Sequence, residues 1–171
     1  HQFVETGISL VPEGRKIFVN LTVRDNLMVG AYAVKQRSVI PERLEEVYSL
    51  FPRMKEREKQ MGGTLSGGEQ QRIVLARAIL KDAPIVVLDE ATAFADPENE
   101  HLIQKALHEL RKGKTVLMIA HHLTSVQDAD KILVIAQGKI AEEGTHSELI
   151  ARNGIYNSMW NEYQRTVTWT V

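Results

Sequence analysis

The stretch "APIVVLDEAT", residues 83–92, decides the fold class of this chain. Its centre, "IVVL" at 85–88, is a continuous apolar run that is far too short to cross a bilayer and is typical of a buried strand. Strands buried on both faces belong mostly to parallel sheets, because crossover helices cover the two faces. The stretch therefore predicts a parallel strand covered on both faces, with Asp89 and Glu90 at its carboxyl end.

Helix-like and strand-like segments alternate around this strand. A helical pattern precedes it at 67–80 and another follows it at 98–114, which leads into a second apolar strand, "TVLMIAHH" at 115–122. "GISLV" at 7–11 supplies a further short strand. The alternation predicts an α/β fold with a mostly parallel sheet flanked by helices. Ligands of such folds gather at the carboxyl ends of the strands.

The remaining elements carry recognisable start signals. Thr22 with Asp25 three positions on, and Thr145 with Glu148, are typical of helix N-termini. The sequence predicts helices at 21–32, 41–51 and 145–154, a hairpin at 131–144 with Gly138 near its turn, and a last helix that carries the aromatic residues of the tail.

Composition sets limits on function. The chain has 171 residues, of which 43% are hydrophobic, and this is enough for one ordinary core. It has 21 basic and 22 acidic residues, so no strong net charge draws it to nucleic acid, and we expect no nucleic-acid partner. The absence of cysteine excludes disulfides and thiolate metal sites. No signal peptide or membrane span is recognisable, so we expect no direct membrane insertion.

Asp89 and Glu90 are the first candidate functional pair. Adjacent residues of a strand point to different sides, so one carboxylate can hold a hard cation such as Mg²⁺ while the other faces a water molecule. The alternative is that acidic residues simply favour the turn after a strand. His121 ends the next strand and can orient a water or contact a phosphate oxygen, although a single histidine there is more often structural.

"GTLSGGEQQRIVLARAIL" at 63–80 contains the second candidate site. Ser66 is placed to cap the helix that follows, and Gly67 and Gly68 bring backbone amides to the positive end of the helix dipole. The alternative is a capped helix with a flexible lead-in. That reading explains Ser66 but not two glycines in the first turn, where each costs helix stability. The pattern favours an anion-binding site.

These motifs together resemble those of ATP-binding-cassette ATPases. "LSGGEQQR" at 65–72 resembles the signature motif, "IVVLDE" at 85–90 the Walker B motif, and the histidine after "VLMIA" the switch histidine. "FADPE" at 94–98 resembles the D-loop and "VPEGR" at 11–15 the Q-loop region. The resemblance implies a partial P-loop-NTPase-like sheet with an α-helical signature subdomain, and it implies ATP and Mg²⁺ as cofactors.

The resemblance also implies roles for single residues. Asp89 holds Mg²⁺ through water, Glu90 is the general base for the attacking water, and His121 contacts the γ-phosphate. In a head-to-tail dimer, one group of residues closes over the nucleotide that the partner subunit holds: Ser66, Gly67, Gly68 and Glu69. Asp96 works across the same interface.

Glu13 stands where the family usually has glutamine, at a position that senses Mg²⁺ and couples to a transmembrane subunit or domain. The glutamate departs from the family pattern at this position. A second nucleotide-binding domain and a transmembrane subunit or domain are the implied partners. The implied location is the cytoplasmic face of the inner or plasma membrane, reached through the transmembrane partner.

A P-loop, G-x-x-x-x-G-K-[ST], is missing from the sequence. "GKT" at 113–115 is no substitute, because the required first glycine falls on His108 and the segment joins a helix to a strand. In the family the P-loop precedes the Q-loop, so we expect it before His1. We therefore expect a single incomplete nucleotide-binding domain over 1–171: Q-loop and helical subdomain at about 12–80, catalytic core at about 81–150, and a C-terminal helix at 151–171.

The two halves resemble different branches of the family. Up to about Gln71 the sequence is similar to ATPase subunits of branched-chain amino-acid importers, and from Arg72 it is similar to bacterial multidrug or lipid exporters. Two functions stay open. The chain is part of a transporter ATPase that is active only in a complete dimer, or it is a non-catalytic fragment or chimera that serves as an interaction or folding module.

Overall fold

The computed structural model describes residues 7–14, 16–89, 97–120 and 122–168. The chain forms two compact units, which divide between Ile119 and Ala120. Glu90, Asp96 and His121 lie outside the described residues.

A parallel three-stranded sheet forms the centre of the first unit. Its strands are β1 (Ile8–Val11), β2 (Ile85–Asp89) and β3 (Thr115–Ile119), in the spatial order β1-β2-β3. Val11 is in register with Leu88, and Asp89 is in register with Ile119. All three strands therefore end at the same edge of the sheet. The predicted α/β fold with a parallel sheet is confirmed.

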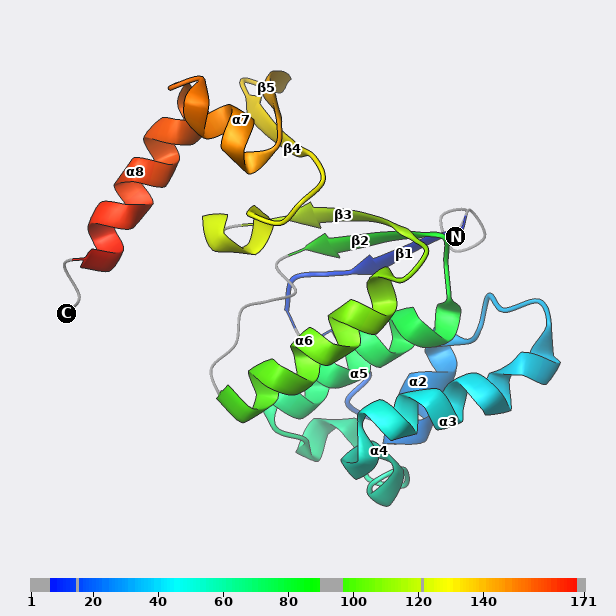
Figure 1. The fold of residues 1–171 in the computed structure, drawn as a ribbon. Helices are drawn as coiled ribbons and strands as arrows, with labels where there is room; N and C mark the ends of the chain where they lie inside the picture. The colour runs from blue at the N-terminus through cyan, green and yellow to red at the C-terminus, as the bar shows by residue number, and fades with distance from the viewer. Residues whose placement is uncertain (1–6, 15, 90–96, 121, 169–171) are drawn as a thin grey trace. The chain divides into compact units, whose positions relative to one another are not determined.

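Two long helices cover one face of this sheet. α5 (Gly67–Lys81) and α6 (Pro97–Arg111) lie together along it (Figure 1). Val86 and Leu88 of β2 are fully buried there, as are Ile103 and Leu107 of α6. Burial of the apolar stripes of these helices against the strands is the main stabilising contribution in this unit.

The opposite face of the sheet is exposed. Leu10, Leu117 and Ile119 are 59%, 52% and 49% exposed, and Ile85 is 39% exposed. The prediction that "IVVL" is covered on both faces is therefore wrong for the described residues. Successive side chains of a strand point to opposite faces, and α5 and α6 meet only one of them. An apolar run indicates that both faces of a strand are suited to burial. It does not indicate which segment of the chain covers each face.

Shorter helices complete the first unit. They are α2 (Val23–Gly30), η1 (Arg37–Val39), α3 (Ile40–Leu50), α4 (Pro52–Glu56) and η2 (Gly62–Thr64). Thr22 caps α2 by accepting a bond from the Asp25 amide at 3.1 Å, as predicted. α3 confirms the helix predicted at 41–51, and it buries Leu44, Val47 and Tyr48 on one face.

The second unit is built on a β-hairpin and two helices. It contains η3 (Leu123–Val126), β4 (Ile132–Ala136), β5 (Lys139–Gly144), α7 (His146–Ala151) and α8 (Ile155–Thr168). Gln137 and Gly138 form the hairpin turn with φ angles of 51° and 73°, which fits the predicted turn. Thr145 caps α7 in a capping box with Glu148, as predicted.

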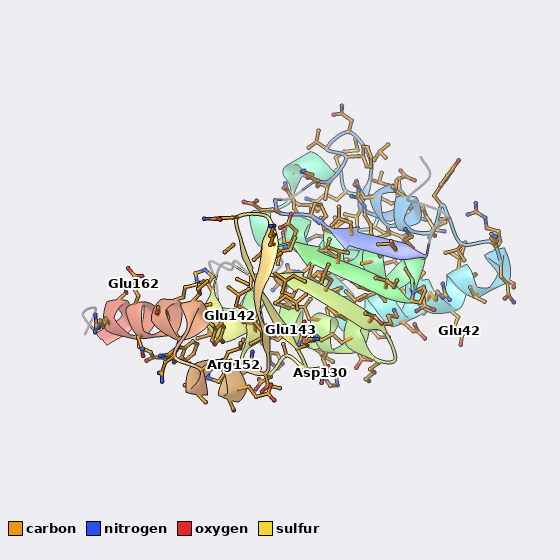
Figure 2. All side chains as sticks on the ribbon, turned by 90° about the horizontal axis from the view of Figure 1, so that it is seen from above. Glu42, Asp130, Glu142, Glu143, Arg152 and Glu162 are labelled. Atoms are coloured by element: carbon orange, nitrogen blue, oxygen red, sulfur yellow. The ribbon has the colours of Figure 1, made fainter. Side chains whose placement is uncertain are left out.

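A carboxylate fastens the start of α8 to the hairpin. Glu142 of β5, which Figure 2 labels, accepts bonds from the Ile155 amide at 2.7 Å and the Tyr156 amide at 3.0 Å. Tyr156 is 1% exposed, and its hydroxyl lies 2.8 Å from Nδ1 of His146. The negative charge also suits the positive end of the α8 dipole. In the part of the chain that the structure describes, every helix is too short or too polar to span a bilayer.

Candidate functional site

The N-terminus of α5 carries a complete capping box. The Ser66 hydroxyl accepts a bond from the Glu69 amide at 3.4 Å, and Oε2 of Glu69 accepts one from the Ser66 amide at 2.8 Å. Ser66 has extended backbone geometry, with φ −63° and ψ 161°, as an N-cap requires. The predicted capping role of Ser66 is confirmed. The sequence S-G-G-E is therefore well suited to a helix start, because both members of the box are present.

Glu69 is held in place from a second side. Its Oε1 forms an ion pair of 2.7 Å with Nη1 of Arg57, and its side chain is only 14% exposed. Burial on its own raises the pKa of Glu69, but the bonds from Ser66 and the positive charges of Arg57 and Arg72 outweigh it and hold the pKa below its usual value. Glu69 is therefore ionised at neutral pH, and its charge is neutralised locally.

Gly67 and Gly68 leave two backbone donors available at this helix start. They occupy the first two helical positions, whose amides have no acceptor within a helix. Ser66 is exposed and both glycines are partly exposed, so a ligand can approach the backbone closely. Two amides and a hydroxyl at the positive end of a helix dipole fit the oxygens of a phosphate group. Of the predicted site residues, Ser66, Gly67, Gly68 and Glu69 form one cluster.

Asp89 is the one described member of the predicted metal and catalytic pair. It is the last residue of β2 and is half-buried, and its neighbour in the sheet is Ile119 of β3. A carboxylate oxygen at this edge fits the preference of Mg²⁺ for oxygen ligands. Among the residues that the structure describes, no three His, Asp or Glu side chains gather as a metal-binding group. Glu90, Asp96 and His121 lie outside the described residues, so their placement stays a prediction.

Glu13 lies at the same edge of the sheet as Asp89. It follows the end of β1 by two residues, Val11 is in register with Leu88, and its own side chain is exposed. The structure thus places Glu13 and Asp89 after the ends of neighbouring strands. Ser66 and Glu69 belong to a different cluster, at the start of α5.

A buried network, which the sequence analysis missed, fixes the loop that follows Glu13. Arg77 of α5 donates to the carbonyl oxygens of Lys16 and Asn26, at 2.8 Å in each case, and it lies over the Phe18 ring. Asn26 is fully buried and binds the backbone of Phe18 through both its amide nitrogen and its oxygen. Burial lowers the pKa of Arg77 to about 10, which leaves the side chain charged at neutral pH. The Glu13 loop is therefore anchored to the α2 and α5 helices.

α5 and the strands run in opposite directions, which relates the two clusters. Lys81 at the end of α5 donates to the carbonyl oxygen of Ile8 at the start of β1. The N-terminus of α5 therefore points toward the side on which the strands end, as Figure 1 shows. Both clusters face this side of the first unit, but each has its own donors and acceptors.

Known proteins are similar to this chain in sequence. The family model described as "ABC transporter" matches residues 1–93. The chain is 55% identical over 100 residues to the mycobactin import ATP-binding/permease protein IrtA of Mycolicibacterium thermoresistibile, which is 58% of this chain and 11% of that protein. It is 44% identical over 135 residues to the ATP-dependent lipid A-core flippase of Xanthomonas oryzae pv. oryzae, which is 79% of this chain and 21% of the flippase.

A solved structure is also similar. A bacterial Atm1-family ABC exporter with ATP bound matches 91% of this chain and 28% of its own chain, with a TM-score of 0.74 and 31% sequence identity. The matched regions thus span between 11% and 28% of the full length of these proteins.

Proposed function

Because this chain belongs to the ABC transporter family, we propose that it supplies the signature, Walker B and switch-histidine portion of an ATPase that powers transport. The observation that carries the proposal is the α5 N-terminus, where Ser66, Gly67 and Gly68 present a hydroxyl and two amides to an anion. The proposed cofactors are ATP and Mg²⁺. The proposed setting is the cytoplasmic face of a membrane, reached through a transmembrane partner.

Three residues perform the chemistry at the strand ends in this proposal. Asp89 orients the water shell of the metal, Glu90 accepts the proton of the attacking water, and His121 contacts the γ-phosphate. Mg²⁺, when bound, neutralises charge that develops on the phosphate oxygens. The position of Asp89 at the end of β2 supports its proposed role, because ligands of parallel sheets gather at the carboxyl ends of the strands.

The signature cluster serves the nucleotide of a second domain. In a head-to-tail dimer, Ser66 and the two glycines of one domain close over the γ-phosphate bound by its partner, and Asp96 works across the same interface. The capping box supports this role, because Glu69 holds the Ser66 amide while the amides of Gly67 and Gly68 have no acceptor within the helix. Closure of the dimer then requires bound nucleotide. ATP binding drives the transport cycle through this closure.

Glu13 is the proposed link to the membrane partner. It is exposed and follows β1. The loop after it is anchored by Arg77 and Asn26, so a displacement of this loop is transmitted to α2 and α5. Relatives whose names combine "ATP-binding" with "permease" support a transmembrane partner for this chain. The direction of transport and the transported substrate stay open.

On its own the chain is proposed to be inactive, because its sequence contains no P-loop to hold the phosphates. The proposed divisions are the Q-loop and helical subdomain at about 12–80, the catalytic core at about 81–150, and the C-terminal helix at 151–171.

Isothermal titration of the 171-residue chain with Mg–ATP tests this proposal. We expect no tight one-site binding, because the signature cluster offers only part of a phosphate site. Tight one-site binding would show that the chain holds nucleotide without a P-loop, and it would contradict the proposal that the P-loop is needed. The alternative function, a non-catalytic interaction or folding module, predicts in addition that joining a P-loop segment to the chain restores no hydrolysis.

A further inference from the structure

A largely apolar pocket lies beside the start of α5. Its volume is about 270 Å³, and its apolar walls include Val23, Phe51, Met54, Leu65, Ile73 and Leu102. The first five of these side chains are all less than 9% exposed, so the walls are fixed by the core of the first unit. An apolar cavity of about 150 Å³ holds a benzene molecule. This pocket therefore has room for an aromatic ring together with a short alkyl chain.

The pocket has a positively charged rim. Arg53, Arg57 and Arg72 line it, and among the described lining residues Glu69 supplies the one carboxylate. Arg57 is paired with Glu69 but remains 42% exposed, so further donors of its guanidinium face solvent. Among the described residues, no ion pair holds Arg53. Because Arg57 already balances the Glu69 carboxylate, the guanidinium of Arg53 leaves this rim with a positive charge that favours a negatively charged ligand.

We propose that this pocket binds a small apolar carboxylate, such as an aryl- or alkyl-carboxylic acid. The hydrocarbon part fills the apolar walls, and the carboxylate pairs with Arg57 and Arg53 at the rim. The volume is too small for a nucleotide, and a free phosphate at the rim would leave the apolar walls unfilled. None of the pocket residues belongs to the predicted metal or catalytic set at the strand ends, and Glu69 is the one described lining residue that belongs to the predicted nucleotide-binding set.

A ligand bound in the pocket affects the signature cluster, which is Ser66, Gly67, Gly68 and Glu69, through Arg57. Glu69 accepts from Arg57 with one oxygen, at 2.7 Å, and from the Ser66 amide with the other, at 2.8 Å. A ligand carboxylate competes with Glu69 for Arg57. The environment of the Ser66 and Glu69 amides therefore changes when the pocket fills, and the pocket becomes a place at which a small molecule influences the phosphate-facing cap.

The probe for this site is 3-phenylpropionate, titrated without nucleotide into the ¹⁵N-labelled 171-residue chain and followed by amide NMR shifts. We expect saturable shifts at Ser66 and Glu69 with a Kd on the order of 1 mM or tighter, which is ordinary for a ligand of this size. No saturable shift up to about 20 mM in the folded chain would overturn the proposal.

Two comparisons distinguish the proposed binding mode from nonspecific hydrophobic binding. The alcohol 3-phenylpropanol has a similar shape without the charge, and R57Q removes the paired guanidinium. We expect each to weaken binding by about tenfold or more, because a charge-assisted hydrogen bond is lost. R24Q is the matched control, since Arg24 pairs with Glu58 and does not line the pocket, and its affinity should equal that of the unmodified chain.

Equal binding of the acid and the alcohol, or unchanged affinity in R57Q, would contradict the proposal. Circular dichroism of each variant confirms that the fold is retained. Because no nucleotide is present, a failure here leaves the proposed ATPase role untouched, and a failure of that role leaves this pocket untouched.

Discussion

Single residues at the start of α5 connect local sequence to the candidate phosphate site. Ser66 and Glu69 satisfy each other's amides, and Arg57 reaches the same carboxylate from the segment after α4. The capping residues Ser66, Thr22 and Thr145 were predictable because their partners lie three residues away. Arg57 was not, because its partner is 12 residues along the chain and no local pattern marks the pairing.

Replacement of Glu69 by glutamine tests the charge of the capping box. The folded-state pKa of Glu69 lies below its usual value of about 4.5, so its ionised form stabilises the fold at any pH above that value. This contribution is lost as the pH falls through the depressed folded-state pKa. We expect E69Q to lower the free energy of unfolding by about 1 kcal/mol at pH 7.

Urea unfolding of both proteins at a series of pH values measures this difference. The gap between the unmodified chain and E69Q should shrink as the pH falls from about 4.5 through the lower folded-state pKa of Glu69, because the protonated carboxyl is then as neutral as glutamine. A gap that stays constant down to pH ~2.5 would mean that the carboxylate charge of Glu69 does not stabilise the cap.

At the scale of elements, the strands and long helices followed from their apolar periodicity, which is a local property of the sequence. The packing of these elements against one another was harder to predict from the sequence. The Asn26–Arg77 network joins residues 51 positions apart, and no pattern within α2 or α5 indicates it. The exposed sheet face was missed for a related reason, since the apolar run in β2 is the same whether or not a second layer covers it.

The contact between α2 and α5 depends on Gly30. A Cβ atom at this position would lie 2.6 Å from both Cα and the carbonyl oxygen of Arg77, which is too close for backbone atoms that cannot move aside. We expect G30A to lower the free energy of unfolding by about 1–3 kcal/mol, because the two helices must separate. Urea denaturation measures it, with V29A as control, since the neighbouring Val29 is 40% exposed. Equal or higher stability of G30A would refute the close contact.

The start of α8 depends on Glu142 of the hairpin, which Figure 2 labels beside Glu143. Replacement of Glu142 by alanine removes the acceptors of the Ile155 and Tyr156 amides. We expect E142A to destabilise the second unit by about 0.5–2 kcal/mol and to speed hydrogen exchange at both amides.

The matched control is E143A. Glu143 pairs with Lys131 at 3.1 Å on the exposed surface, and such pairs contribute about 1 kcal/mol or less. Its loss should leave the Ile155 and Tyr156 exchange rates unchanged. Equal exchange rates in E142A and E143A would show that Glu142 does not cap α8.

At the scale of the whole molecule, the family and the fold were predictable because ordered motifs mark them. The family match and the likeness to an exporter structure confirm that part. The resemblance of the first half to branched-chain importers stays a prediction. The proposed join near Gln71 and Arg72 lies inside α5, whose residues pack closely against α2 from the first half. A junction there has to preserve contacts such as the one between Gly30 and Arg77.

The central claim is that the Ser66 cluster serves a nucleotide held by a second domain. The most direct test uses this sequence completed by an upstream P-loop segment, with Glu90→Gln to block hydrolysis while nucleotide binding is kept. Light scattering with Mg–ATP should then report twice the monomer mass. Addition of Ser66→Arg places bulk and misdirected charge where the backbone must meet phosphate, so the mass should return to that of a monomer that still binds ATP. A dimer that forms equally well with Ser66→Arg would contradict the claim.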